Sequence, residues 1–190
     1  MKHFELSHDL EVMFTERLIQ IDILNNSAWT HRFYTLFGNG AVAEKKGDDV
    51  VNAEVEYAQR IIRLLPSNAA PWNYLRGYIP SRFPYNSVLK FNNHPLSTIT
   101  TFAQEFAPLT DSILVESTKD LQISASVNIS SSASEVSTVS VHALDVLAQI
   151  YAEKDKKLAK LYLGGLAKSD TMRKGYWEFR VEKLGEVAVQ

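Results

Sequence analysis

The sequence predicts an all-α protein, an α-solenoid in which antiparallel helix pairs stack into an α-α superhelix. Three observations predict this fold class. Apolar residues recur three or four positions apart, short asparagine-containing turns separate the helical stretches, and one pattern returns after 43 residues. In that pattern a tryptophan follows an asparagine by four positions, at Asn25 and Trp29 and again at Asn68 and Trp72. Repeats of roughly 34 to 47 residues built from paired helices are typical of solenoids.

The first helix pair is expected at about residues 5–38. Its first helix, over residues 5–21, is predicted by an apolar stripe of Leu10, Met13, Phe14, Leu18 and Ile21. A second apolar run starts at Ala28 and stops at Gly38, and a glycine just past the last turn is a common helix terminator.

The second pair is expected at about residues 50–80. Its long helix is predicted by apolar residues at Val51, Val55, Ala58, Ile61, Ile62 and Leu65. Pro66 ends this helix because proline lacks the amide donor and disfavours helical structure in the residue before it. Asn68 is placed to cap a short following helix that contains Trp72.

The third unit is expected at about residues 140–188, where helical spacing returns after a less regular stretch. Arg180 follows Trp177 by three positions, as Arg32 follows Trp29. Before this unit, residues 98–106 predict a short helix, and residues 117–138 contain eight serines in 22 positions. We expect this serine-rich segment to be a disordered insertion in one helical-repeat domain that spans residues 1–190.

Composition excludes several classes of function. The chain has no cysteine, which excludes disulfides, cysteine-ligated metal sites and a thiol nucleophile, and its formal net charge of −2 argues against nucleic acid as main partner. No segment has the run of about 18 apolar residues that a membrane span needs, and the N-terminus lacks the features of a secretory signal, so we expect a cytoplasmic protein. No phosphate-binding loop, dinucleotide fingerprint, nucleophile elbow or paired-histidine zinc motif is present. We therefore expect no catalytic residue and no bound metal in this chain.

The candidate functional residues are those of the repeat motif. The neighbouring His31 and Arg32 could meet a phosphate or a partner's carboxylate, because arginine offers a bidentate fork, or they could form a contact between repeats. Trp29, Trp72 and Trp177 are interpreted as core aromatics that hold each helix pair together.

These motifs resemble a known family. Residues 25–32, NNSAWTHR, look like the N-x-x-x-W-x-x-R core of the prenyltransferase α-subunit repeat, and residues 68–77, NAAPWNYLRG, resemble the repeat that follows it. Residues 170–180, DTMRKGYWEFR, are similar to the last helix of the α subunit shared by protein farnesyltransferase and type I geranylgeranyltransferase. The repeat-motif and possible subunit-interface residues are Asn25, Trp29, His31, Arg32, Asn68, Trp72, Asn73, Tyr74, Arg76, Trp177 and Arg180.

The resemblance implies an α subunit that acts as the scaffold of a heterodimeric enzyme. In that family a β subunit holds the zinc and the isoprenoid pocket, and magnesium assists departure of the diphosphate in the farnesyl enzyme. The enzyme transfers farnesyl or geranylgeranyl from its diphosphate to the cysteine of a C-terminal CaaX sequence. The Rab-type geranylgeranyltransferase α subunit is a close relative, but the closing helix with Trp177 favours the CaaX type.

The sequence also departs from the family pattern. The family has further repeats before the one that contains Trp29, and one of them carries a lysine near the diphosphate. The resemblance therefore implies an α subunit truncated at its N-terminus, inactive by itself. Arg76 follows Trp72 by four positions, where the plain repeat has its arginine at three. The alternative hypothesis is a free-standing helical-repeat adaptor for protein interactions, without enzyme activity.

Overall fold

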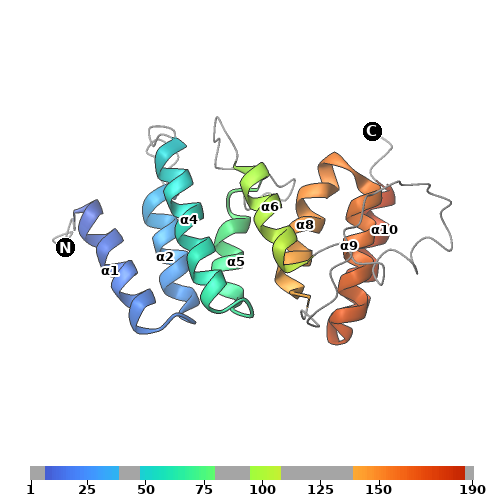
Figure 1. Cartoon of the computed structure of the whole chain (residues 1–190), viewed down its shortest axis with the longest axis horizontal. Helices are drawn as coiled ribbons and strands as arrows, with labels where there is room; N and C mark the ends of the chain where they lie inside the picture. The colour runs from blue at the N-terminus through green and yellow to red at the C-terminus, as the bar shows by residue number, and fades with distance from the viewer. Residues whose placement is uncertain (1–6, 39–47, 80–94, 108–138, 187–190) are drawn as a thin grey trace, which may run out of the picture. The chain divides into compact units, whose positions relative to one another are not determined.

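The computed structural model describes residues 7–38, 48–79, 95–107 and 139–186. Within these residues every regular element is helical, and the helices pack in pairs, so the predicted all-α fold of paired helices is confirmed (Figure 1). The chain divides into two compact units, Met1–Ile99 and Thr100–Gln190. The predicted disordered insertion at 117–138 lies outside the described residues, and the expectation of a single domain stays a prediction.

Unit 1 contains two helix pairs. The first pair is α1 (His8–Ile21) and α2 (Asn26–Phe37), and the second is α4 (Asp48–Leu64) and α5 (Ala69–Arg76). Figure 1 shows the members of each pair side by side, joined by a short turn. The boundaries agree with the predicted helices to within a few residues.

Asparagines begin the second helix of each pair, as the sequence predicts. The Asn25 side chain accepts a hydrogen bond from the backbone N–H of Ala28, and Asn68 accepts one from that of Ala70. Each bond satisfies an amide that the first turn of a helix leaves without a partner. The predicted stripe of α4 is buried at Val51, Val55, Ala58 and Ile62.

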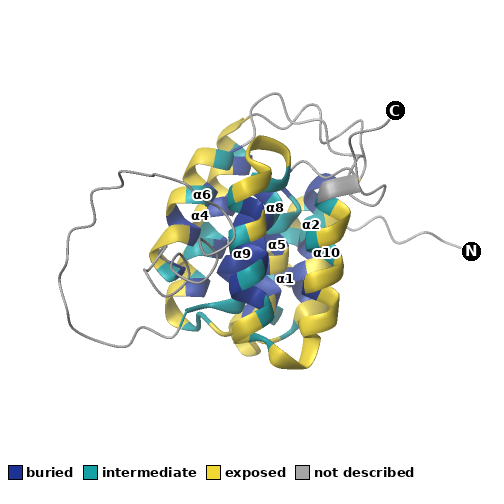
Figure 2. Cartoon of the chain, turned by 90° about the vertical axis from the view of Figure 1, so that its right-hand side faces the viewer, coloured by how far each residue is buried: buried dark blue, intermediate teal, exposed yellow. Residues whose placement is uncertain are grey.

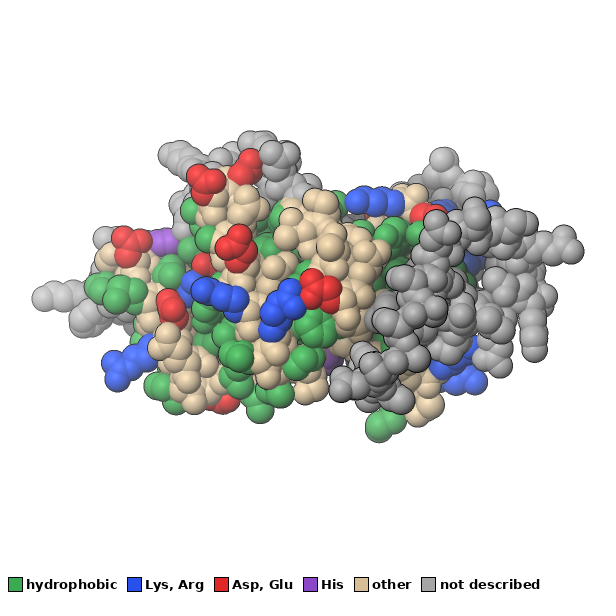
Figure 3. Space-filling view, in the orientation of Figure 1, with side chains coloured by type: hydrophobic (Ala, Val, Ile, Leu, Met, Phe, Trp, Pro, Cys, Tyr) green, Lys and Arg blue, Asp and Glu red, His purple; other side chains and the backbone are tan. Residues whose placement is uncertain are grey.

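The stripe of α1 predicted the helix correctly but not its buried face. Leu10, Met13, Phe14 and Ile21 are exposed, whereas Thr15 and Ile19 are buried. The hydroxyl of Thr15 donates to the carbonyl of Val12 in its own helix, so its burial leaves no donor unpaired. Figure 3 shows the resulting hydrophobic side chains on the surface over α1.

Unit 2 contains three packed helices and the C-terminal part of α6 (Leu96–Phe106), in which the boundary between the units falls. The helices are α8 (Val141–Lys154), α9 (Lys156–Ser169) and α10 (Lys174–Glu186), with the 3-10 turn η1 (Thr171–Arg173) before α10. Asp155 ends α8 and caps α9, because its carboxylate accepts from the amides of Lys157 and Leu158. The region predicted as one repeat unit thus holds three helices.

The core of unit 2 lies along α8 and α9, where Leu144, Leu147, Tyr162 and Leu166 are fully buried. Figure 2 shows α10 as largely exposed. Among the described side chains of this helix, that of Trp177 is buried. None of the described helices is long and apolar enough to cross a membrane.

Candidate functional site: the junction between helix pairs

The repeated asparagine and tryptophan build the same turn in both pairs of unit 1. The indole N–H of Trp29 donates to the carbonyl of Ile23, and that of Trp72 donates to the carbonyl of Pro66, six residues back in each case. Both indoles are buried, and because each N–H has an acceptor, a large aromatic side chain fills the interior without leaving a donor unpaired. The sequence repeat is therefore also a repeat of hydrogen bonds.

Asn68 does more than cap α5. Its side-chain N–H donates to the carbonyl of Ile23 at 2.7 Å, and Ile23 lies in the turn of the preceding pair. Because the other end of the same amide caps α5, one side chain joins the two turns to each other. Asn68 is buried, whereas Asn25 is half-buried and its side chain caps α2.

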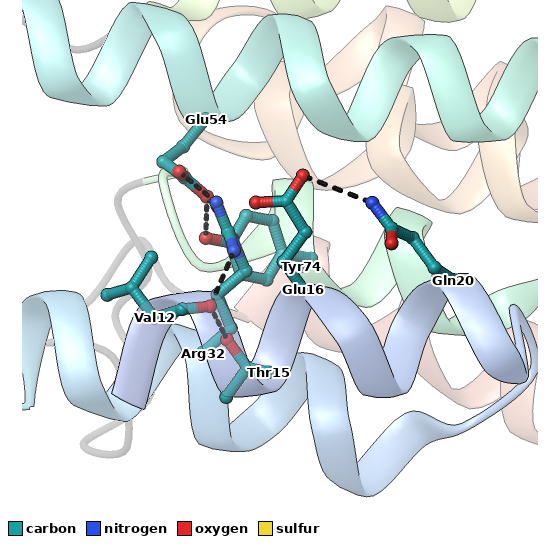
Figure 4. Close-up of polar contacts among 7 residues, drawn as sticks. All are labelled: Val12, Thr15, Glu16, Gln20, Arg32, Glu54 and Tyr74. Carbon is teal, nitrogen blue, oxygen red and sulfur yellow. Dashed lines mark hydrogen bonds and ion pairs between the residues drawn. The ribbon is translucent and has the colours of Figure 1, made fainter. Parts of the chain in front are cut away.

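The two pairs meet at a buried polar cluster of Arg32, Glu54 and Tyr74 (Figure 4). The guanidinium of Arg32 donates to both carboxylate oxygens of Glu54, through Nε at 2.7 Å and Nη2 at 2.6 Å. The hydroxyl of Tyr74 donates to the same carboxylate at 2.6 Å. A bidentate pair of this kind fixes direction as well as distance. The cluster therefore ties α2, α4 and α5 together in one register.

The cluster also reaches α1. Nη1 of Arg32 donates to the carbonyl of Val12, and the guanidinium lies 4.6 Å from the centre of the Tyr57 ring. Arg32 is 5% exposed and Glu54 8% exposed, so both charges are removed from water. Their hydrogen bonds and the aromatic face supply the partners that water would otherwise provide.

Burial and charge shift the pKa values of these groups in the directions that keep the cluster intact. Burial raises the pKa of the Tyr74 hydroxyl well above its ordinary value, and the nearby Tyr78 and Glu54 raise it further. Burial by itself would lower the pKa of Arg32, but its hydrogen bonds to Glu54 and the attraction of that carboxylate raise it instead. Tyr74 thus stays neutral and Arg32 stays charged at neutral pH.

Aromatic side chains surround the polar cluster. Trp29 lies 5.2 Å from Tyr74 and 5.5 Å from Tyr57 between ring centres, and Phe33 meets Tyr74 edge to face at 5.5 Å. Edge-to-face contacts of this length are favourable because the positive ring edge meets the negative ring face. The motif residues therefore form the inside of the junction.

Three predicted site residues lie away from the cluster. His31 and Asn73 are exposed, and Arg76 is half-buried. His31 and Arg32 are neighbours in sequence but do not form one site, because Arg32 is buried against Glu54 while the His31 ring faces Glu11 at 4.0 Å. The carboxylate that Arg32 meets belongs to this chain.

The C-terminal motif of unit 2 forms a second cluster. Asp170 accepts hydrogen bonds from the Trp177 indole and from Arg173, and these outweigh desolvation and lower the pKa of its carboxyl group. Arg180 donates to Asp145 of α8 at 2.6 Å, and its guanidinium lies 5.5 Å from the Trp177 ring centre. Arg180 therefore ties α10 to α8, as Arg32 ties α2 to α4, whereas Trp177 binds Asp170 in the segment before α10.

Sequence reasoning missed the two acidic partners, Glu54 and Asp145. Each lies on the buried side of its helix, Glu54 beside Val55 and Asp145 between Leu144 and Val146. A carboxylate inside an apolar stripe was the available signal, since a buried acid requires a donor. Among the described residues, no group of three histidine, aspartate or glutamate side chains could hold a metal ion.

With this geometry in place, the chain can be compared with known proteins. The family model described as the protein prenyltransferase alpha subunit repeat matches residues 8–38, the stretch that forms α1 and α2. Within those residues the chain is similar to a protein prenyltransferase alpha subunit repeat. The resemblance that the sequence motifs indicate is thereby confirmed, and Trp29 and Arg32 lie within the matched residues.

Three curated relatives extend the likeness beyond the repeat, and each is named protein farnesyltransferase/geranylgeranyltransferase type-1 subunit alpha. The Dictyostelium discoideum protein is 24% identical over 93% of this chain, the Pisum sativum protein 25% over 94%, and the Candida albicans protein 29% over 97%. The chain spans about half the length of these relatives, between 45% and 49%.

A solved structure shares the fold. The chain matches one chain of Candida albicans protein geranylgeranyltransferase-I complexed with GGPP, with a TM-score of 0.60 and 24% identity. The match covers 92% of this chain and 46% of the other. The helix pairs of this chain therefore share their fold with that solved chain.

Proposed function

We propose that this chain acts as the scaffold part of the alpha subunit of a heterodimeric protein prenyltransferase, and that its partner is the β subunit. The observation that carries the proposal is the likeness, over 93% to 97% of the chain, to three proteins with one and the same subunit name. The reaction is transfer of farnesyl or geranylgeranyl from its diphosphate to the cysteine of a CaaX sequence. Cytoplasm is the compartment we propose.

The junction geometry supports a scaffold role. Arg32 and Tyr74 carry groups that could act on a substrate, but both are buried and bonded to Glu54. A side chain held in this way positions helices and has no free face for chemistry. We therefore propose that zinc, the isoprenoid pocket and the catalytic groups lie on the β subunit, that magnesium joins the assembled enzyme, and that this chain is inactive by itself.

Exposed motif residues are the candidates for contact with the partner. Asn73 is exposed on α5, one position after the buried Trp72. Its side chain offers both a donor and an acceptor, which suits a polar contact at the edge of an interface. We propose Asn73 as such a contact.

Co-expression tests the proposal. The chain is produced together with a tagged prenyltransferase β subunit, and the complex is isolated through the tag. We expect the chain to be retained in a one-to-one complex, and expect Asn73→Ala to reduce retention while the exposed control Thr30→Ala does not. A chain that is never retained, also when a complete relative's alpha subunit binds the same β subunit, contradicts the proposal. A soluble monomer that ignores the β subunit favours the adaptor alternative.

A further inference from the structure

Four exposed lysines surround the turn between α8 and α9. They are Lys154 at the end of α8 and Lys156, Lys157 and Lys160 in the first two turns of α9, and together they are called the lysine surface. All seven lysines of the described residues lie in unit 2, and these four fall within seven positions. Figure 1 shows the turn at the end of the α8–α9 pair that lies opposite the link to α10.

The charges of the lysine surface are not used within the fold. Among the described residues none of the four lysines forms an ion pair, whereas Arg173 and Arg180 of the same unit are each paired with an aspartate. Two acids, Glu153 and Asp155, lie in the same stretch. The Asp155 carboxylate is bonded to the first amides of α9, so it holds the helix and not a lysine. The surface therefore presents an excess of positive charge to solvent.

Helix stability does not explain these charges either. Lys156 and Lys157 stand in the first turn of α9, which contains no acidic residue. The N-terminal end of a helix carries the positive end of its dipole, so a cation there lowers helix stability. A binding partner outside the fold accounts for lysines at these two positions, and the helix itself does not.

The residue types indicate which anionic partner fits. Arginine offers a rigid fork that matches one carboxylate or phosphate, whereas lysine is a point charge on a flexible stem. Protein interfaces are depleted of lysine and have an apolar centre, but no residue of 153–160 is both apolar and exposed. The net charge of −2 argues against nucleic acid. Lysines without arginine or an apolar centre suit a fluid surface on which the anions move.

We propose that the lysine surface binds an anionic lipid bilayer. The ammonium groups attract the negatively charged headgroups of phospholipids without selecting one geometry, and the turn lets the end of the α8–α9 pair meet a flat membrane. Clusters of about four or more basic residues on a helix are typical of such binding. The chain lies on the bilayer and does not cross it, in agreement with the absence of a spanning helix among the described residues. The proposal goes beyond the proposed function and does not depend on it.

Co-sedimentation of the full chain with vesicles tests the proposal. One set of vesicles contains equal parts of phosphatidylcholine and phosphatidylserine, and the other contains phosphatidylcholine alone. We expect binding to the first set only, and expect it to weaken as salt rises from about 50 mM to about 200 mM, because salt screens exposed charges. The double variant Lys156→Gln, Lys157→Gln should lower the partition coefficient at least about tenfold, since one lysine near an anionic bilayer contributes about fivefold.

A matched double variant separates the lysine surface from net charge. Lys168→Gln, Lys174→Gln removes the same two charges at the opposite end of α9 and the start of α10, and should change binding less than about twofold. Circular dichroism confirms that both variants are folded. Equal effects of the two double variants, or no binding to phosphatidylserine vesicles at low salt, overturns the proposal.

Two further measurements identify other partners. Lys156→Arg, Lys157→Arg should keep vesicle binding within about twofold, because a bilayer reads charge and not the shape of the cation. Loss of binding in this variant, or displacement of the vesicles by inorganic phosphate at constant ionic strength, would show a discrete anion site and overturns the proposal. Tighter binding of a poly-glutamate peptide or of duplex DNA than of the vesicles, at the same salt, also overturns it.

Discussion

Replacing Glu54 with leucine should destabilise unit 1 by about 3–5 kcal/mol, because the change leaves a buried charge without its partner. The structure sets this magnitude. The Glu54 carboxylate accepts three hydrogen bonds of 2.6 to 2.7 Å, and the Arg32 side chain left behind is only 6% exposed. Arg32→Leu should cost a similar amount, since it strands the buried carboxylate.

The double variant separates the ion pair from simple loss of contacts. With both charges replaced by leucine, the Tyr74 hydroxyl loses its acceptor and the Val12 carbonyl loses one donor, at a cost of about 1–3 kcal/mol. The double variant should therefore be more stable than either single variant. Urea unfolding followed by far-ultraviolet circular dichroism measures all four free energies of a double-mutant cycle. Single variants that cost less than about 1 kcal/mol, or costs that simply add, refute the reasoning.

Three further predictions follow from individual contacts. Asn68→Ala should lower the free energy of unfolding in urea by about 2 kcal/mol and Asn25→Ala by about 1 kcal/mol, because Asn68 both caps α5 and binds Ile23. Equal losses would contradict the role of Asn68 in joining the two turns. Gly77→Ala should destabilise the fold by about 1–3 kcal/mol and lower its melting temperature, because a Cβ at this position overlaps the Phe33 ring. Gly175→Ala, in open space within α10, should leave the melting temperature unchanged or raise it. The raised pKa of Tyr74 favours its neutral form in the folded state, so its contribution is complete below the unfolded pKa of about 10 and is lost as the pH rises above it. Unfolding midpoints between pH 8 and pH 11 should fall less steeply for Tyr74→Phe than for the unaltered chain, and parallel curves would show that Tyr74 does not contribute.

The buried ion pair also suggests why the junction uses charges at all. Taking Arg32 and Glu54 out of water is costly, and an apolar pair of similar volume would often be as stable. A bidentate pair, however, is satisfied in one register only, whereas apolar side chains tolerate small shifts between helices. Our hypothesis is that this cluster sets the register of neighbouring pairs, which the double leucine variant tests through its near-ultraviolet spectrum. An unaltered spectrum in that variant contradicts the hypothesis.

Most of the helices could be predicted from the sequence because their signals are local. The caps at Asn25 and Asn68, the stop at Pro66 and the stripe of α4 each depend on a few neighbouring residues. The motif residues of unit 1 were also identified, since the repeat itself marks them. The repeat period and the capping residues are thus sufficient to predict the helices and to identify the tryptophans that hold each helix pair together.

The partners of those residues could not be predicted in the same way. Which face of α1 is buried depends on where α2 lies, and the spacing of Leu10 and Phe14 says nothing about that. Glu54 is 22 residues from Arg32 and Asp145 is 35 from Arg180, so neither pair leaves a local pattern. A carboxylate within an apolar stripe predicts that a donor exists, but three-dimensional packing decides which one.

Sedimentation velocity with a purified prenyltransferase β subunit tests the central claim most directly. The chain and the β subunit are mixed in equal amounts and compared with each protein alone. If the chain is the scaffold part of an alpha subunit, we expect a single faster-sedimenting species whose mass is the sum of one chain and one β subunit. Two independent boundaries that stay at the positions of the separate proteins, at concentrations where a complete relative's alpha subunit binds, would contradict the account.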